Sequence, residues 1–285
     1  MSKFLDDLVE FINTQPFNVI RISAVKDDGE IETYSFGRSN PCQNIYSGAK
    51  VYAMTAIGLL YDRGLVSLDE KIVDIFEDEL PEGIDPRWEN CTVEMVVAHR
   101  AGIPGGFLDI DCEPSTNFGE DFLEYLFKTP LAYDPGTEER YSDGAYYLLS
   151  RIVSKKTGMT ADNYLWKEIL FKLGFLEMAW SHCPKGYPIG ATGMYISSED
   201  MVKMGMVYLN NGVYRGQRVL SEEWCKMAVE KQFTFEWDSE HKIYFKGGMH
   251  GQKLFVSPEQ NRVVAMQSFG ANTNIVCDWI KNYKE

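Results

Sequence analysis

The order of the predicted elements indicates an α+β fold, in which both ends of the chain contribute strands to one antiparallel sheet. Three observations support this: a helix and two strands begin the chain, helical signals dominate residues 65–185, and three strands and a helix end it. We expect a five-stranded sheet flanked by N- and C-terminal helices, built from residues 1–64 and 186–285. Residues 65–185 should form a mainly helical domain.

The first elements follow from hydrophobic spacing. Residues 3–14 place apolar side chains on one helical face, and residues 18–26 and 30–37 have the composition of strands. Asp27-Asp28-Gly29 lies between these strands and is typical of a hairpin turn. We therefore expect an N-terminal helix that packs on a β-hairpin.

Residues 47–63 form a helical pattern that is apolar nearly all round and ends at Gly64. A helix of this kind lies in the middle of a molecule, because it has no face for solvent. The later part of the chain gives two helical patterns, three β-rich runs and a final helix. These are residues 198–209 and 221–231, then 241–247, 253–257 and 262–269, and finally 274–283.

Composition limits the function. The 285 residues are 45% hydrophobic and 25% charged, which is typical of a globular chain, and the net charge is −14. Such a charge repels phosphate backbones and anionic lipids, so we expect no binding to nucleic acid or membranes. The N-terminal residues lack the basic and apolar segments of a signal peptide, so we expect a cytoplasmic protein.

Cysteine and histidine spacing predicts neither a disulfide framework nor a metal centre. The six cysteines contain no C-x-x-C pair, and the four histidines form no H-x-H or H-E-x-x-H motif. We expect free thiols and no cofactor or bound metal.

The motif S-x-x-K occurs three times, and context separates the three matches. Ser23–Lys26 lies in a predicted strand, where residues three apart point to opposite faces, and Ser239–Lys242 lies in a polar loop. Only Ser47–Lys50 opens a helix, where residues three apart share a face.

The apolar surroundings predicted for Lys50 would lower the pKa of its ammonium and make it a proton acceptor from Ser47. The N-terminal end of the helix also offers N–H groups to a developing oxyanion. The alternative is a serine helix cap followed by a lysine whose ammonium reaches solvent.

Two further motifs accompany this pair: Tyr141-Ser142-Asp143 before a helical pattern, and Lys246-Gly247-Gly248 at the end of a strand. In this order the three motifs resemble the S-x-x-K, Y-x-N and K-[ST]-G elements of the penicillin-recognising serine hydrolases. That family contains class C β-lactamases, DD-peptidases, and related esterases and amide hydrolases, including a 6-aminohexanoate-dimer-hydrolase-like branch. Five collinear blocks carry the resemblance: 68–76, 92–104, 134–158, 190–218 and 246–258.

The resemblance implies a β-lactamase/transpeptidase-like fold with the active site in the cleft between the sheet and the helical domain. It implies that Ser47 attacks a carbonyl and is acylated, and that Lys50 helps to remove its proton. Tyr141, between Lys50 and Lys246, would move protons as a phenolate. The backbone N–H groups of Ser47 and Met249 would form the oxyanion hole.

Two departures from the pattern affect the expected chemistry. Asp143 replaces Asn, and its carboxylate would either weaken Lys50 as a base by favouring the ammonium or only orient it. Gly247 replaces the Ser or Thr whose hydroxyl helps the family to hold a substrate carboxylate, so we expect weaker recognition of such anions. Gly248 and His250 are assigned to substrate binding. For His99 the simplest explanation is a residue that caps carbonyls at a helix end.

We therefore expect a cytoplasmic serine hydrolase that acts on a small ester or amide through a Ser47 acyl-enzyme. One alternative is a β-lactamase or a D-Ala or D-amino-acid peptidase. Another, of a different class, is a non-catalytic penicillin-binding or sensor protein.

Overall fold

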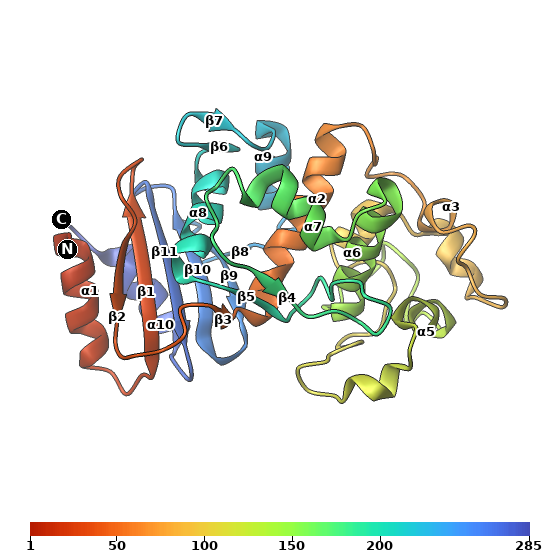
Figure 1. Cartoon of the computed structure of the whole chain (residues 1–285), viewed down its shortest axis with the longest axis horizontal. Coiled ribbons are helices and arrows are strands. Elements are labelled where there is room, and N and C mark those ends of the chain that lie inside the picture. The colour runs from red at the N-terminus through yellow and green to blue at the C-terminus, as the bar shows by residue number, and fades with distance from the viewer. The chain divides into compact units, whose positions relative to one another are not determined.

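The computed structural model describes all 285 residues, which divide into two compact units (Figure 1). The sheet unit consists of Met1–Gly48, Lys172–Ala179 and Met194–Glu285, and the helical unit consists of Ala49–Phe171 and Trp180–Gly193. The sequence-based division placed residues 49–64 with the sheet and began the second sheet segment at residue 186. In the structure the helix that follows Gly48 groups with the helical unit, because it packs on helices of that unit.

The sheet unit contains a six-stranded antiparallel sheet in the order β2-β1-β11-β10-β9-β8 (Figure 1). Its strands are β1 (Val19–Lys26), β2 (Glu32–Ser35), β8 (Glu236–Trp237), β9 (Tyr244–Gly248), β10 (Gln252–Ser257) and β11 (Arg262–Ser268). The α+β fold class is confirmed, but the expectation of five strands is wrong. The sixth strand, β8, has only two residues, too few to show an alternating pattern. The Asp238 carboxylate accepts the N–H groups of Lys242 and Ile243 and so closes the turn that pairs β8 with β9.

Helices cover both faces of this sheet. The terminal helices α1 (Lys3–Asn13) and α10 (Thr273–Asn282) share one apolar core with alternate side chains of the strands, among them Phe255 and Val264. The neighbouring residues Leu254 and Val263 point to the other face, where α8 (Ser198–Leu209) packs (Figure 1). The flanking helices expected from the sequence are therefore confirmed.

Shorter elements complete the sheet unit. β3 pairs with β5 and β6 pairs with β7, both antiparallel. The elements are β3 (Gln43–Asn44), η1 (Tyr46–Gly48), β4 (Ala179–Trp180, at the boundary between the units), β5 (Met194–Ile196), β6 (Val213–Tyr214), β7 (Gln217–Arg218), α9 (Glu222–Glu230) and η5 (Met249–Gly251).

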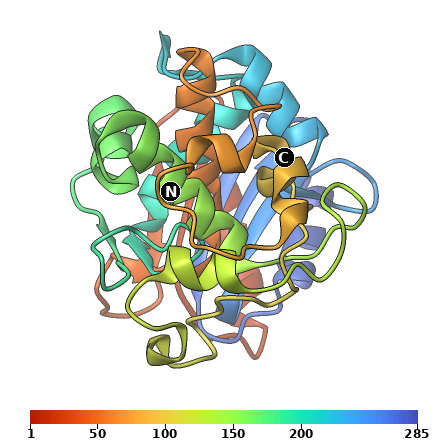
Figure 2. The same cartoon turned by 90° about the vertical axis from the view of Figure 1, so that its right-hand side faces the viewer.

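The helical unit is built around α2 (Ala49–Asp62), in which every residue from 49 to 60 is buried. α2 packs against α6 (Asp143–Thr157) and α7 (Ala161–Leu165), as its uniformly apolar sequence predicts. Figure 2 shows the short helices and long loops of this unit. The remaining elements are α3 (Ile72–Ile75), η2 (Pro86–Asn90), α4 (Val93–Val97), η3 (Ser115–Phe118), α5 (Phe122–Lys128) and η4 (Trp166–Leu170).

Two further properties concern the whole chain. All six cysteines are free thiols, and four of them are buried. None of the helices combines the length and the hydropathy needed to cross a lipid bilayer.

Packing between α8 and the sheet gives a stability prediction. A methyl group on Gly205 would lie 2.5 Å from Val263 Cγ1 and 3.0 Å from Leu254 Cδ1. Overpacking costs ~1–3 kcal/mol, whereas Ala gains only ~1 kcal/mol over Gly in a helix. Gly205→Ala should therefore lower the free energy of unfolding, measured by urea denaturation. Gly37→Ala is the control, because a Cβ at Gly37 meets nothing within 4 Å. If Gly205→Ala had the same free energy of unfolding as the wild-type protein, the close packing would be contradicted.

Candidate functional site

Lys50 lies one residue into α2 and is fully buried. Its Nζ lies 2.6 Å from Asp143 Oδ1 and donates a hydrogen bond to the carbonyl oxygen of Ala191 at 3.1 Å. Asp143 is the first residue of α6 and is only 6% exposed. The packing of α2 on α6 therefore brings the lysine of the first motif and the aspartate of the second motif together as a buried ion pair.

The protonation state of Lys50 differs from the sequence-based expectation. Burial alone lowers the pKa of its ammonium, but attraction to Asp143 and Tyr141 outweighs burial, so the pKa of Lys50 stands above its ordinary value. The predicted lowering is wrong, because it treated the ammonium as unpaired. Lys50 is held as a cation and is a poor proton acceptor in this state.

Tyr141 lies against this cation. The Lys50 Nζ is 4.5 Å from the centroid of the Tyr141 ring and 5.7 Å from that of Tyr146. Tyr141 is 46% exposed, so its ring contacts the buried pair on one side and solvent on the other. Negative charge on the Tyr141 oxygen would be stabilised by the neighbouring ammonium.

His99 supports the Tyr141 segment. Its ring lies 4.6 Å from the Tyr141 ring and 4.8 Å from the Tyr146 ring, and its Nδ1 accepts the backbone N–H of Ser142 at 3.3 Å. Its own carbonyl accepts the N–H of Arg140 at 2.8 Å. His99 is 6% exposed and has a φ of 56°, a conformation that is uncommon for residues other than glycine. The helix-end cap expected for His99 is confirmed, because at the end of α4 its N–H donates to the Val96 carbonyl at 3.2 Å and the next N–H, of Arg100, donates to the Met95 carbonyl at 2.6 Å. In addition, the His99 ring and Nδ1 hold the residues on either side of the Tyr141–Ser142 bond.

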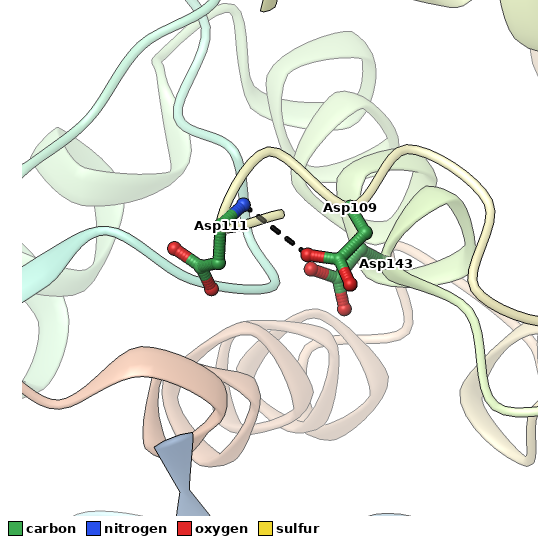
Figure 3. A group of neighbouring side chains, drawn as sticks. All are labelled: Asp109, Asp111 and Asp143. Atoms are coloured by element: carbon green, nitrogen blue, oxygen red, sulfur yellow. Dashed lines mark hydrogen bonds between the residues drawn. The ribbon is translucent and has the colours of Figure 1, made fainter. Parts of the chain in front are cut away.

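Three carboxylates lie beside this group. One oxygen from each of Asp109, Asp111 and Asp143 lies within 4.8 Å of the others, and Asp109 accepts the backbone N–H of Asp111 at 3.2 Å (Figure 3). These are the residues that could hold a hard cation. Asp143 is already paired with Lys50, and Asp111 accepts a hydrogen bond from Thr192 at 2.5 Å. Burial raises the pKa of Asp111, and the charges of Asp143 and Asp109 act in the same direction.

Ser47 belongs to the sheet unit. It is half-buried in the 3-10 turn η1, directly before α2, rather than in the first turn of a regular α-helix. The turn is closed by the Gly48 N–H, which donates to the Ile45 carbonyl at 2.9 Å. Tyr46, the residue before Ser47, has a φ of 49°, which costs roughly 1 kcal/mol for a residue with a Cβ.

The end of β9 packs against this turn. A Cβ on Gly248 would lie 2.1 Å from the Ile45 oxygen, so only glycine permits this approach. Lys246, on the same strand, is 5% exposed, and its Nζ lies 4.0 Å from Glu236 Oε1. The structure therefore places the third motif beside the Ser47 turn within the sheet unit.

Met249 and His250 follow β9 in the turn η5. Met249 is 36% exposed, and His250 has a φ of 62°. The His250 ring stacks on Phe269 at 4.4 Å and lies 5.1 Å from the Tyr46 ring. These contacts fix His250 beside the residue that precedes Ser47.

The predicted site residues thus form two groups. The helical unit holds Lys50, Tyr141 and Asp143, and the sheet unit holds Ser47 and residues 246–250. Sequence reasoning did not single out Asp109, Asp111, Tyr146 or Lys253. The aspartates lie in a loop without periodicity, so no pattern marks them. Lys253 lies in an otherwise apolar strand, and this isolated charge is the feature of the sequence that could have singled it out.

Comparisons with known proteins agree with this fold. The chain is 30% identical to an N-acetylmuramyl-L-alanine amidase of Bacillus subtilis (strain 168), in an alignment that covers 82% of this chain and 69% of the relative. It is 28% identical to a Salmonella schwarzengrund protein assigned as a D-alanyl-D-alanine carboxypeptidase, where 80% of this chain spans about half (51%) of the relative.

Among solved structures, a penicillin binding protein from Bacillus halodurans superposes with a TM-score of 0.71 at 16% identity. That superposition covers 99% of both chains, which shows the same fold. The model of the family described as Beta-lactamase matches residues 26–274, most of the 285-residue chain. This chain therefore belongs to the Beta-lactamase family, whose members include serine hydrolases with the S-x-x-K motif.

Proposed function

We propose that this protein hydrolyses a small ester or amide through an acyl-enzyme formed on Ser47. Membership of the Beta-lactamase family supports the reaction class. The observation that carries the proposal is the buried Lys50–Asp143 pair, which fixes a cation three residues after Ser47 and against the Tyr141 ring. If Lys50 had only a structural role, it would need neither a positive charge nor contact with the half-exposed phenol of Tyr141.

In the first step the Ser47 oxygen forms a bond to the substrate carbonyl carbon, and its proton passes to the Tyr141 oxygen. The bond to the leaving group then breaks, and the leaving alcohol or amine takes that proton. Lys50 stays an ammonium throughout and stabilises negative charge on the phenol oxygen. The burden of proton transfer therefore falls on Tyr141.

In the second step a water molecule gives a proton to Tyr141 and attacks the acyl carbon. The bond from that carbon to the Ser47 oxygen then breaks, Tyr141 passes the proton to the Ser47 oxygen, and the acid is released. We assign the oxyanion hole to the backbone N–H groups of Ser47 and Met249, each worth roughly 3 kcal/mol of transition-state stabilisation. Lys246 is assigned to the stabilisation of Tyr141 and the substrate, and Gly248 and His250 to the substrate-binding surface.

The names of the relatives favour amide over ester cleavage as the natural reaction. The Bacillus subtilis relative is an amidase, and the Salmonella relative is assigned as a peptidase. We therefore include amides, a D-Ala peptide and a cephalosporin beside short acyl esters in the substrate panel. This panel also separates the alternatives of a β-lactamase and a D-Ala peptidase.

The first prediction tests the nucleophile. A fluorophosphonate should label Ser47, and Ser47→Ala should abolish both the label and turnover of p-nitrophenyl butyrate, measured by mass spectrometry and absorbance. Ser239→Ala is the matched control, because Ser239 also begins an S-x-x-K sequence but lies in a turn of a different loop. A stable penicillin adduct on Ser47 without turnover of any substrate would favour the alternative of a non-catalytic sensor. Fluorophosphonate labelling of a residue other than Ser47 would refute Ser47 as the nucleophile.

The second prediction concerns Asp143. Asp143→Asn should keep at least roughly a tenth of kcat/KM, a loss below ~1.4 kcal/mol, because the amide oxygen can still accept from Lys50. The assay is ester turnover as a function of pH, at a temperature well below the melting point of the variant.

Melting temperatures control for folding, because this substitution leaves the buried Lys50 ammonium without a counter-charge. In the wild type the raised pKa of Lys50 stabilises the folded state below pH ~10.5, and this stability is lost above the folded-state pKa. A folded variant with a loss well above tenfold would show that the carboxylate has a chemical role.

The third prediction concerns His99 as a positioning residue. His99→Ala removes both the ring contact with Tyr141 and the acceptor for the Ser142 N–H. We expect kcat to fall about tenfold with KM nearly unchanged, because ~1–2 kcal/mol of support is lost at the proton-transfer group.

His99→Asn should recover part of this loss, because its side-chain oxygen can take the place of Nδ1 and Asn tolerates a positive φ. Circular dichroism checks that both variants are folded. Equal activities of the Ala and Asn variants would rule out the Ser142 hydrogen bond as the means of support.

A further inference from the structure

One buried hydroxyl group holds the turn η5, in which Met249 lies. Ser268 is the last residue of β11 and is 1% exposed. Its Oγ donates to the Gly251 carbonyl at 2.8 Å and to the His250 carbonyl at 3.1 Å. A single hydroxyl proton is therefore shared between two successive carbonyl groups of the turn.

Two further hydrogen bonds tie the same region to the end of β11. The Gly270 N–H donates to the His250 carbonyl at 2.9 Å, and Gln252 Nε2 donates to the Ser268 carbonyl at 2.5 Å. Gln252 follows η5 directly and is only 4% exposed. The turn and the residue after it are thus both bonded to one strand end.

The backbone of η5 needs this support. His250 has a φ of 62° and Gly251 a φ of 90°, and the first of these is unfavourable for a residue with a Cβ. Such conformations persist only where the surrounding structure fixes them. A Cβ on Gly251 would lie 2.5 Å from Ser268 Oγ, so glycine is required for the hydroxyl to reach the turn.

Met249 lies between two fixed residues. On its N-terminal side, Gly248 approaches the Ile45 carbonyl so closely that a Cβ would lie 2.1 Å from the oxygen. On its C-terminal side, the His250 carbonyl is held by Ser268. Because Met249 is the first residue of η5, no carbonyl within the turn can accept its N–H. The direction of this N–H is therefore set by the two residues beside it.

We infer that Ser268 is a positioning residue, whose hydroxyl holds η5 in the conformation that directs the Met249 N–H to the substrate oxyanion. This inference rests on the proposed function, in which the N–H groups of Ser47 and Met249 form the oxyanion hole. Both donors and Ser268 belong to the sheet unit. An oxyanion donor is effective only at a fixed position, because the charge that it stabilises develops in the transition state.

The test separates effects on the transition state from effects on substrate binding. Ser268→Ala should lower kcat for p-nitrophenyl butyrate about tenfold and leave KM within about twofold, because a displaced donor affects the oxyanion more than the bound ester. The rate constant for modification of Ser47 by a fluorophosphonate should fall by a similar factor. A loss confined to KM, or no loss, would overturn the inference.

Ser257→Ala is the matched control. Ser257 is also a buried serine of the sheet, 3% exposed, but it lies at the end of β10 remote from η5, opposite Arg262. Its kcat should stay within about twofold of the wild-type value, with thermal melting as the check that each variant is folded. An equal fall in kcat in the Ser257 variant would assign the effect to the loss of any buried hydroxyl and overturn the inference.

Two other substitutions at the same position test the hydroxyl itself. Ser268→Thr keeps the hydroxyl on a side chain that suits a strand, so it should recover most of the kcat that the alanine variant loses. Ser268→Cys has a weaker donor of similar size, and its kcat should also fall. The cysteine variant replaces the alanine variant if the latter does not fold, and a wild-type kcat in the cysteine variant would then contradict the inference.

Hydrogen exchange separates this inference from the proposed function, because it requires no substrate. Peptides that contain residues 249–252 should exchange their amide hydrogens faster in Ser268→Ala than in the wild type. Faster exchange in the variant, with no hydrolysis of any substrate by the wild type, would support the hold of Ser268 on η5 and contradict the hydrolase. Hydrolysis by the wild type with an unchanged kcat in the variant would contradict only the inference.

Discussion

The buried ion pair between Lys50 and Asp143 is the interaction on which the candidate chemistry depends. An ammonium with no exposed surface is tolerated because a carboxylate lies 2.6 Å away and a carbonyl accepts a second hydrogen bond. Removing either partner would leave an unpaired buried charge, which typically costs ~3–5 kcal/mol. The pair therefore fixes the contact of α2 with α6, keeps Lys50 charged, and holds a cation against the Tyr141 ring.

Glycine allows the second group of site residues to pack closely. The approach of the Ile45 carbonyl to Gly248 would be blocked by any side chain, and it places the Ser47 turn on the end of β9. Left-handed backbone at Tyr46 and His250 flanks this contact, and the rings of these two residues meet at 5.1 Å. Backbone strain of this kind persists where the surrounding structure holds it, and it is concentrated at functional sites.

The charges near the candidate site residues are not simply those expected from the net charge of −14 of the whole chain. The helical unit sets three aspartates beside Lys50, whereas the sheet unit buries Lys246 and Lys253 on opposite faces of its sheet. Buried charges are screened by salt far less than exposed ones, so the field near these few groups differs from that of the chain as a whole. Among the six residues of β10, only Lys253 carries a charge, and its ammonium lies 3.5 Å from the centroid of the Phe245 ring.

The sequence alone determined the periodic and local features: the amphipathic α1 and α10, the uniformly apolar α2, five of the six sheet strands, and three ordered motifs. These depend on residue spacing, which a single sequence records directly. Tertiary structure decided the rest. The charge state of Lys50 depends on a carboxylate 93 residues away, the support of Tyr141 by His99 depends on a ring contact between distant segments, and the two-residue β8 exists because Asp238 closes a turn. Such effects arise from distances between residues remote in the chain, and spacing carries no record of those distances.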